Sequence, residues 1–318
     1  MIECIPKISV LVICYNQERV ISRAIDSLLA QKDYIYEICV SDDCSKDKTW
    51  DILQEYSRQF PGLFVLNRNE PNAGIFENIE KTWTMPTGDL IYSLSGDDEC
   101  GEDWFRNVIE YIQSNNIDYK SELLCIYGDY QCVYPSGDSF VFRNNLVTSG
   151  ISSVSLALRG LIGNRSAVYS KAVLDKFVNV SKGKSHIAES AQDRQLQLFT
   201  QKVYYIPSVG NVYYTQIGVS NNMSKELLDE RKAIPQYTMQ VLIENGYVPT
   251  SSDLNYLEYQ ILCRQQCDSA GLSYRWARFS AFLKSRYPSF AVFYKWLKRA
   301  FFAISIRVQH RRKIHWKI

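Results

Sequence analysis

The sequence lacks the glycine-rich loops that mark two large classes of nucleotide-binding protein. Neither Gly-x-Gly-x-x-Gly nor Gly-x-x-x-x-Gly-Lys-Ser/Thr follows the first strand-like segment, residues 7–14, which argues against a dinucleotide dehydrogenase and a phosphate-loop NTPase. No uncharged apolar run reaches the roughly 18 residues that a membrane-spanning helix needs. Residues 1–7 carry neither the basic region nor the apolar stretch of a signal peptide.

No Cys-x-x-Cys pair occurs among the nine cysteines. The cysteines are odd in number, scattered along the chain and mostly set within strand or helix patterns. Regularly spaced cysteines are typical of disulfide frameworks and metal sites. The observed pattern instead predicts reduced, packed thiols in a cytoplasmic protein.

Acidic side chains are missing from the last fifty residues. Residues 269–318 carry 12 basic and no acidic side chains, whereas residues 1–268 have a net charge of −10. The apolar residues of this tail recur at helical spacing opposite Lys295 and Arg299; they are Phe290, Phe293, Tyr294, Leu297, Phe301, Ile304 and Val308. Such a basic amphipathic helix is typical of proteins that lie on an anionic membrane. The alternative is that it packs on the acidic body of the protein. Nothing else in the chain indicates binding to nucleic acid.

Strand and helix patterns alternate in the first hundred residues. Apolar, β-branched runs predict strands at 7–14, 36–40, 63–66 and 90–94. Apolar residues at helical spacing predict helices at 17–31 and 74–83, and Asp47 can cap another between them. Three strand–helix–strand units in succession predict a Rossmann-like parallel sheet.

The pattern changes after residue 101, where hairpins replace crossover connections. A helix is predicted at 102–115, and strands at 123–127 and 131–134 flank Gly128-Asp129. The turn Pro135-Ser136-Gly137-Asp138 leads into a strand at 139–143. The remaining predictions are helices at 171–180 and 190–201, short strands at 203–206 and 212–214, and helices beyond residue 224. The second half is therefore predicted to be a mixed sheet followed by a helical region.

Polar residues follow each strand of the predicted parallel sheet. They are Tyr15, Asn16 and Glu18 after the first strand, Asp42 and Asp43 after the second, Asn72 and Gly74 after the third, and Asp97 and Asp98 after the fourth. Ligands of open α/β sheets bind beyond the carboxyl ends of the strands, so these residues are expected to converge on one crevice. The acidic pair there is placed to hold a divalent metal and the diphosphate that it neutralises. The alternative is an ordinary turn, which Ser-Gly-Asp-Asp also favours.

Four segments in this order resemble the family 2 glycosyltransferases of the GT-A fold, the type that assembles bacterial surface polysaccharides such as O-antigen or capsule. They are Ser-Val-Leu-Val-Ile-Cys-Tyr-Asn, Asp-Asp-Cys-Ser-Lys-Asp-Lys-Thr, Asn-Ala-Gly-Ile-Phe-Glu-Asn and Leu-Ser-Gly-Asp-Asp. The resemblance covers about residues 7–220. It implies a GT-A domain over 1–222, with a nucleotide-sugar-binding half at 1–100 and an acceptor half at 101–222. Residues 223–318 are then a helical C-terminal region that ends in the basic tail.

The resemblance also implies roles for single residues. Tyr15 stacks on the nucleotide base, Asp43 bonds the base edge, and Asp97 ligates a Mn²⁺ or Mg²⁺ ion on the donor diphosphate, with Asp98 beside it. Two positions depart from the family pattern. Ser95 replaces the first acid of Asp-x-Asp, and Thr215 stands where a basic residue is common.

By the same resemblance, Asp193 is the catalytic base. It lies in Ala191-Gln192-Asp193-Arg194, where Gln192 replaces the usual glutamate. A carboxylate there would take the proton of the acceptor hydroxyl in a single inverting displacement. Glu189 is a rival for this role, and the plain alternative is a solvated carboxylate in the first turn of a helix.

The resulting hypothesis is a metal-dependent inverting glycosyltransferase in the cytoplasm, peripheral on the inner face of the cell membrane. Its donor is a nucleotide sugar, most simply a UDP-sugar, and its acceptor a glycan or lipid-linked saccharide. The alternative is a non-catalytic nucleotide-sugar-binding or scaffold protein of a polysaccharide assembly complex, which Ser95, Gln192 and Thr215 favour.

Overall fold

The computed structural model describes residues 5–143, 166–181, 196, 198–215, 235–240, 242–244 and 247–264. The chain divides into two units, Met1–Leu242 and Ile243–Ile318. The second unit contains helix α9 (Ser251–Arg264). The predicted boundary near residue 222 falls between the described residues 215 and 235 and stays a prediction.

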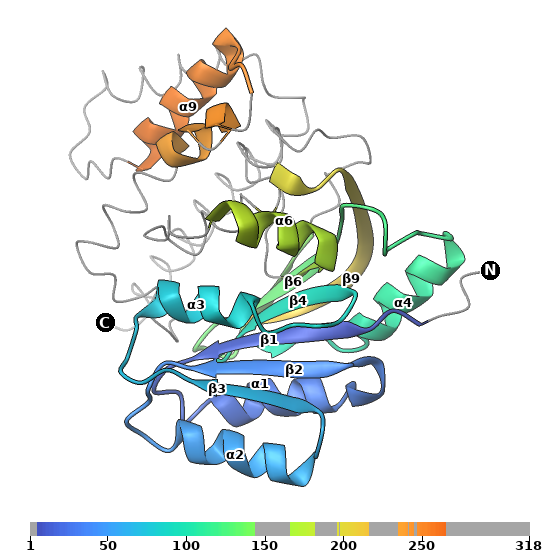
Figure 1. Ribbon diagram of the computed structural model, residues 1–318, viewed down its shortest axis with the longest axis vertical. Helices are drawn as coiled ribbons and strands as arrows, with labels where there is room; N and C mark the ends of the chain where they lie inside the picture. The colour runs from blue at the N-terminus through green and yellow to red at the C-terminus, as the bar shows by residue number, and fades with distance from the viewer. Residues whose placement is uncertain are drawn as a thin grey trace, which may run out of the picture. The chain divides into compact units, whose positions relative to one another are not determined.

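The first hundred residues form the parallel part of a nine-stranded sheet. The strands are β1 (Ile8–Cys14), β2 (Glu37–Asp42), β3 (Phe64–Arg68) and β4 (Leu90–Ser95), and the helices between them are α1 (Ile21–Leu29), the 3₁₀ turn η1 (Lys32–Tyr34), α2 (Thr49–Gln59) and α3 (Ile75–Trp83). The strand order is β3-β2-β1-β4, with all neighbours parallel. Helices α1 and α2 cover one face, and α3 covers the other (Figure 1). The predicted Rossmann-like sheet is confirmed.

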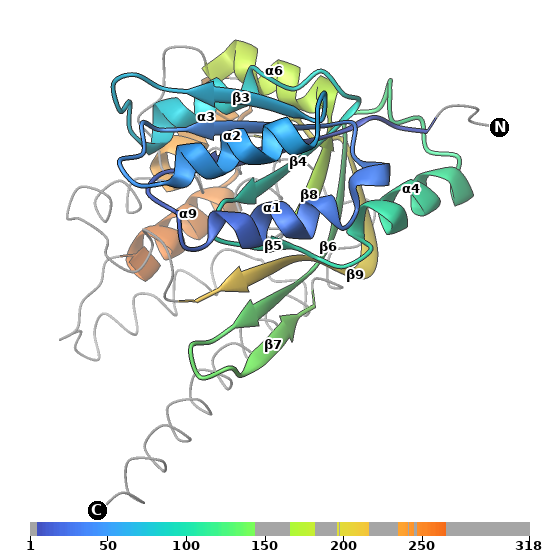
Figure 2. The ribbon, with the colours of Figure 1, turned by 90° about the horizontal axis from the view of Figure 1, so that it is seen from below.

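The second part of the sheet is mixed. Its elements are β5 (Glu99–Cys100), α4 (Trp104–Ser114), β6 (Leu124–Val133), β7 (Ser139–Phe142), β8 (Ala167–Ser170), α6 (Lys171–Ser181) and β9 (Lys202–Tyr214). The sheet continues from β4 as β8-β6-β9-β5, and β8 runs antiparallel to β4. Strands β6 and β7 form the predicted hairpin (Figure 2). One continuous sheet therefore joins the two halves.

Four of the predicted strands form only two. Residues 124–127 and 131–133 belong to the single strand β6, and residues 203–206 and 212–214 belong to β9. The two strands pair in parallel with a register shift at Gly128. Gly128 is needed there because a Cβ atom would lie 2.6 Å from the Trp104 ring. Pro207 is a residue type at which a strand usually ends. It falls within the part of β9 where the register shifts, and strand pairing tolerates proline there.

Each face of the sheet has its own apolar core. On β1, Ile8, Val10 and Val12 pack with the apolar face of α1, while Leu11 packs with Ile79 and Trp83 of α3. The strand is thus buried on both sides, as its continuous apolar run predicts. Helices pack firmly on both faces, which leaves the strand ends as the place where polar loops gather. No helix within the described ranges has the length and apolar character to cross a membrane.

Candidate active site

The parallel strands end in register at one edge. Cys14, the last residue of β1, pairs with Asp42 of β2, and Ile13 pairs with Ser95 of β4. Asp42 in turn pairs with Arg68, the last residue of β3. The order of the strands reverses between β1 and β4, and such a switch point is where α/β sheets bind ligands. The predicted convergence of the four loops on this edge is confirmed.

The loop after β1 and the loop after β2 are joined by reciprocal hydrogen bonds. The backbone N–H of Asn16 donates to Ser45 Oγ at 2.9 Å, and the backbone N–H of Lys46 donates to Asn16 Oδ1 at 2.8 Å. The Glu18 N–H donates to Asp47 Oδ2, and the Lys48 N–H donates to Glu18 Oε2, both at 3.0 Å. Asn16 and Glu18 were predicted to contact the nucleotide sugar. In this structure their side chains hold the two loops together.

Asp47 strengthens this joint. Its Oδ1 accepts hydrogen bonds from the backbone N–H and the hydroxyl of Thr49, at 3.0 and 2.5 Å. Partial burial opposes ionisation, but the bonds from Thr49 and Glu18 outweigh it and lower the pKa of Asp47. A carboxyl whose pKa is lowered on folding stabilises the fold above its unfolded pKa and loses that effect as the pH falls. The hydrogen bonds that Asp47 accepts from Glu18 and Thr49 are therefore kept at neutral pH.

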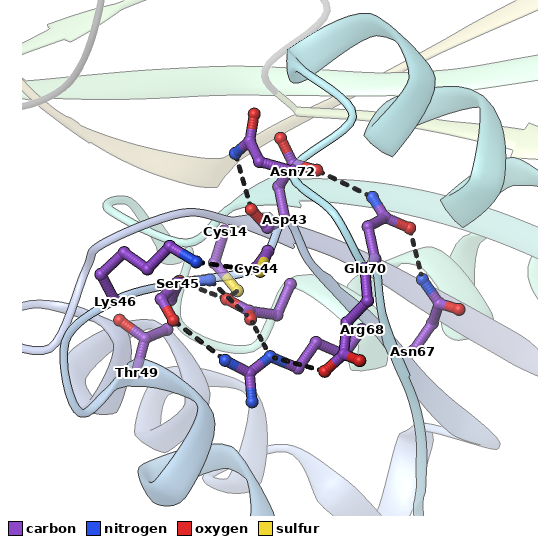
Figure 3. A network of polar contacts seen from close by, with 12 residues as sticks. Cys14, Asp43, Cys44, Ser45, Lys46, Thr49, Asn67, Arg68, Glu70 and Asn72 are labelled. Carbon is purple, nitrogen blue, oxygen red and sulfur yellow. Dashed lines mark hydrogen bonds and ion pairs between the residues drawn. The ribbon is translucent and has the colours of Figure 1, made fainter.

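Asp42 is buried inside the loop that it begins. Its carboxylate accepts the Ser45 N–H at 3.0 Å and the Ser45 hydroxyl, and it lies 3.5 Å from Nε of Arg68. Arg68 also donates to the Ser45 carbonyl at 3.0 Å (Figure 3). Burial raises the pKa of the neighbouring Cys14 thiol, and the Asp42 charge raises it further. The Asp42 side chain has no exposed surface, so in this conformation it shapes the loop, and its predicted contact with a nucleotide sugar stays untested.

Asp43 ties the loop after β2 to the start of α3. Its Oδ1 accepts the Ala73 N–H at 2.8 Å and the Asn69 side-chain amide at 2.9 Å, and its Oδ2 accepts the Gly74 N–H at 2.9 Å. Asn72 donates to the Asp43 carbonyl at 2.7 Å. A carboxylate offers about four acceptor positions, so these three bonds leave one, on Oδ2. Gly74 adopts a φ of +89°, which side-chain-bearing residues rarely adopt.

Tyr15 is the exposed aromatic residue at this edge. It directly follows β1 and is 45% exposed. The adjoining Cys14 carbonyl accepts the Asp43 N–H at 3.0 Å, so the backbones of the two loops run together beside Tyr15. The predicted contacts of Tyr15 and Asp43 with a nucleotide base stay untested.

The turn after β4 carries the predicted metal ligands. A Cβ atom on Gly96 would lie 2.3 Å from Gln17 Oε1 and 3.1 Å from the Ile13 carbonyl, so a side chain there would have to displace the Gln17 side chain. Asp98 is buried and accepts the Tyr214 N–H at 3.2 Å, whereas Asp97 is half-buried. Within the described ranges no three His, Cys, Asp or Glu side chains cluster as a metal site. One or two carboxylates suit Mg²⁺ or Mn²⁺ shared with phosphate oxygens, so Asp97 and Asp98 fit a metal held jointly with a diphosphate.

Arg23 of α1 contacts the turn after β4, and no pattern in the sequence predicts this contact. Its guanidinium Nη2 donates to the Asp97 carbonyl at 2.6 Å. In the sequence, residue 23 only occupies the polar face of a predicted helix.

Other predicted residues lie outside the described ranges. They are Asp193 with Gln192 and Glu189, and the basic tail over 269–318.

The chain was compared with known proteins. Residues 9–121 match the family model described as Glycosyl transferase family 2. EpsE of Bacillus subtilis, by name a glycosyltransferase, is 32% identical over 93 residues, which are 29% of this chain and 34% of that protein. Chondroitin synthase of Escherichia coli is 22% identical over 228 residues, 72% of this chain and 31% of that protein. The chain thus spans about a third of the length of these relatives.

Two solved structures share the fold. The Staphylococcus aureus TarS fragment 1–349 in complex with UDP-GlcNAc has a TM-score of 0.61 at 16% identity, over 86% of this chain and 79% of that one. The mannosyltransferase PcManGT of Pyrobaculum calidifontis, in complex with GDP-Man and Mn²⁺, has a TM-score of 0.55 at 16% identity, over 94% and 81%. The resemblance drawn from the four segments is confirmed, and the fold is GT-A. Residues 9–121 belong to glycosyl transferase family 2.

We expect Asp43→Asn to weaken both the fold and the donor site. The substitution replaces one acceptor oxygen with an NH₂ group, which then faces a backbone or amide N–H. A buried donor left without an acceptor costs about 1–3 kcal/mol. Urea unfolding should show that loss in the free energy of unfolding, and UDP should raise the melting temperature less than in the parent protein. Asp138→Asn, in the exposed turn before β7, is the control. An unchanged urea midpoint for Asp43→Asn would contradict the assigned bonds.

Proposed function

We propose that this chain transfers a sugar from a nucleotide-sugar donor to a saccharide acceptor, as an inverting and metal-dependent glycosyltransferase. The observation that carries the proposal is the gathering of Tyr15, Asp43 and Asp97 at the strand edge where the sheet order reverses. Family membership over residues 9–121 supports the same reaction class. We take the donor to be a UDP-sugar, because TarS was solved with UDP-GlcNAc and with UDP.

In this proposal the donor lies along the edge from the loop after β2 to the turn after β4. The base stacks on Tyr15 and donates an N–H to the remaining acceptor position of Asp43. The loops around the base are held by Asn16, Glu18, Asp42, Asn72 and Gly74. Asp97 and Asp98 would hold the metal. A divalent cation bound there supplies positive charge that stabilises the leaving diphosphate. The structure of PcManGT with GDP-Man and Mn²⁺ supports such a requirement.

The chemistry needs one base on the acceptor side. We assign it to Asp193, whose carboxylate would take the proton from the acceptor hydroxyl while that oxygen attacks the anomeric carbon. A single attack from the face opposite the leaving group inverts the configuration.

The acceptor is proposed to be a lipid-linked saccharide of a surface polysaccharide. The basic tail over 269–318 would then hold the enzyme at the anionic inner face of the cell membrane, where such acceptors are found. Basic side chains near a membrane surface each contribute about 1 kcal/mol of attraction.

A second function has support from three positions. Ser95, Gln192 and Thr215 replace residues that the family pattern would use, which favours a non-catalytic binding or scaffold protein. A turnover assay with a panel of nucleotide sugars and Mn²⁺ separates the two proposals. Release of nucleoside diphosphate with transfer to a saccharide supports the enzyme, and tight binding without turnover supports the scaffold.

We expect UDP to raise the melting temperature more in Mn²⁺ or Mg²⁺ than in EDTA, because the diphosphate binds through the metal. Asp97→Ala should remove this metal-dependent difference and keep the smaller shift in EDTA. Differential scanning fluorimetry measures both, with Asp33→Ala, an exposed carboxylate, as the control. Equal stabilisation of the parent protein by UDP in EDTA and in Mn²⁺ would overturn the metal assignment.

A further expectation separates binding from chemistry at Asp193. Asp193→Asn should bind UDP in Mn²⁺ as the parent does, because its side chain is not part of the donor site. Turnover should fall by roughly 10² or more, the usual effect of losing a general base. Rates under saturating donor measure this, and near-normal turnover would move the role to Glu189.

The tail should bind the protein to anionic vesicles in a salt-dependent way. Replacing Arg311, Arg312 and Lys313 with glutamine should reduce sedimentation with vesicles that contain phosphatidylglycerol, and added salt should reduce it further. A control replaces three exposed lysines of the folded body, Lys32, Lys81 and Lys120, by glutamine. Equal loss in both variants would mean that net charge, and not the tail, drives the binding.

A further inference from the structure

The turn that carries the proposed metal ligands has an unusual charge. Asp97, Asp98 and Glu99 follow one another, so three carboxylates lie within three residues. Like charges this close repel one another unless cations or hydrogen-bond donors lie beside them. The compensating groups come from two elements far away in the sequence, α1 and β9.

From α1, Arg23 makes three contacts with the turn and its surroundings. Its Nη2 donates to the Asp97 carbonyl at 2.6 Å, and its Nε lies 3.2 Å from Glu99 Oε1. Its guanidinium carbon lies 3.5 Å from the centre of the Tyr214 ring. A flat group that donates at its edge and stacks on its face has its orientation fixed, which lysine cannot reproduce.

From β9, Tyr214 holds the same turn at two points. Its hydroxyl donates to Glu99 Oε1 at 2.5 Å, and its backbone N–H donates to Asp98 Oδ1 at 3.2 Å. Glu99 is therefore bound on two sides, and the turn is fixed between a helix and a strand.

We propose that Arg23 is a positioning residue for the donor site, which fixes the Asp97–Glu99 turn in the shape that binds a divalent cation together with a nucleoside diphosphate. The inference rests on the proposed function. Its contact with Asp97 is to the backbone carbonyl, so it sets the path of the turn that carries the Asp97 side chain. Oε1 of Glu99 meanwhile is held by both Arg23 and Tyr214.

Positioning and charge repulsion predict opposite effects of removing Arg23 on the affinity for Mn²⁺. By Coulomb's law, a guanidinium near a cation site repels the cation, so its removal should strengthen Mn²⁺ binding. If Arg23 acts by fixing the turn, its removal should weaken Mn²⁺ binding. Loss of a residue that orients metal ligands typically lowers metal affinity 10–100-fold.

The test titrates Mn²⁺ at a fixed UDP concentration and follows binding by calorimetry, with the full chain and its variants Arg23→Met and Arg23→Lys. We expect both variants to need about tenfold or more Mn²⁺, while UDP binding in EDTA stays at the parent value. Arg106→Met, which removes an arginine from the surface of α4, is the control and should behave as the parent. If Arg23→Met does not fold, Arg23→Lys, which keeps the charge and the long side chain, decides the question.

Four results would overturn the inference. Unchanged or tighter Mn²⁺ binding in Arg23→Met would show that Arg23 does not position the turn, and parent-like binding in Arg23→Lys would show that the flat guanidinium is not required. A parallel loss of UDP binding in EDTA would show a general structural defect. A parent protein whose UDP binding does not depend on Mn²⁺ would overturn the proposed function as well, and so differs from a failure of Arg23 alone.

Discussion

The site depends on two adjacent carboxylates at the end of β2. Asp42 holds its own loop by bonding Ser45 and pairing with Arg68, and Asp43 bonds the backbone at Ala73 and Gly74, where α3 begins. Both are almost completely buried, and a buried charge is tolerated only when donors surround it. The backbone N–H groups that meet them therefore fix the paths of the loops. The positions of Tyr15 and of the Asp43 carboxylate depend on these loop paths.

Much of the fold could be predicted, because in the parallel half the sequence pattern and the local structure agree. Continuous apolar strands alternate with amphipathic helices, and each strand end is marked by polar residues. The errors fall in β6 and β9, where Gly128 and Pro207 resemble turn signals. The role of Gly128 depends on Trp104, whose ring lies close to both Gly128 and Gly210. A local pattern cannot report such a contact.

The same distinction holds within the site. The places of Tyr15, Asp43 and Asp97 could be predicted because they depend only on where strands end. The bracing contacts of Asn16 and Glu18 could not, since they depend on the shape of a partner loop 29 and 30 residues away. Arg23 lies 74 residues from Asp97 in the sequence, and its helix pattern would be the same if it faced solvent.

The two ends of the donor site are also held by different parts of the molecule. Among the residues that the structure describes, the bonds around Tyr15 and Asp43 come from the parallel half, so the end proposed to bind the base is held within one run of the chain. The Asp97–Glu99 turn instead depends on Tyr214 at the end of β9, which belongs to the mixed half that would bind the acceptor. Any shift of β9 on binding an acceptor must move the Asp98 and Glu99 contacts. The proposed diphosphate end is therefore mechanically linked to the acceptor side, whereas the base end is independent of it.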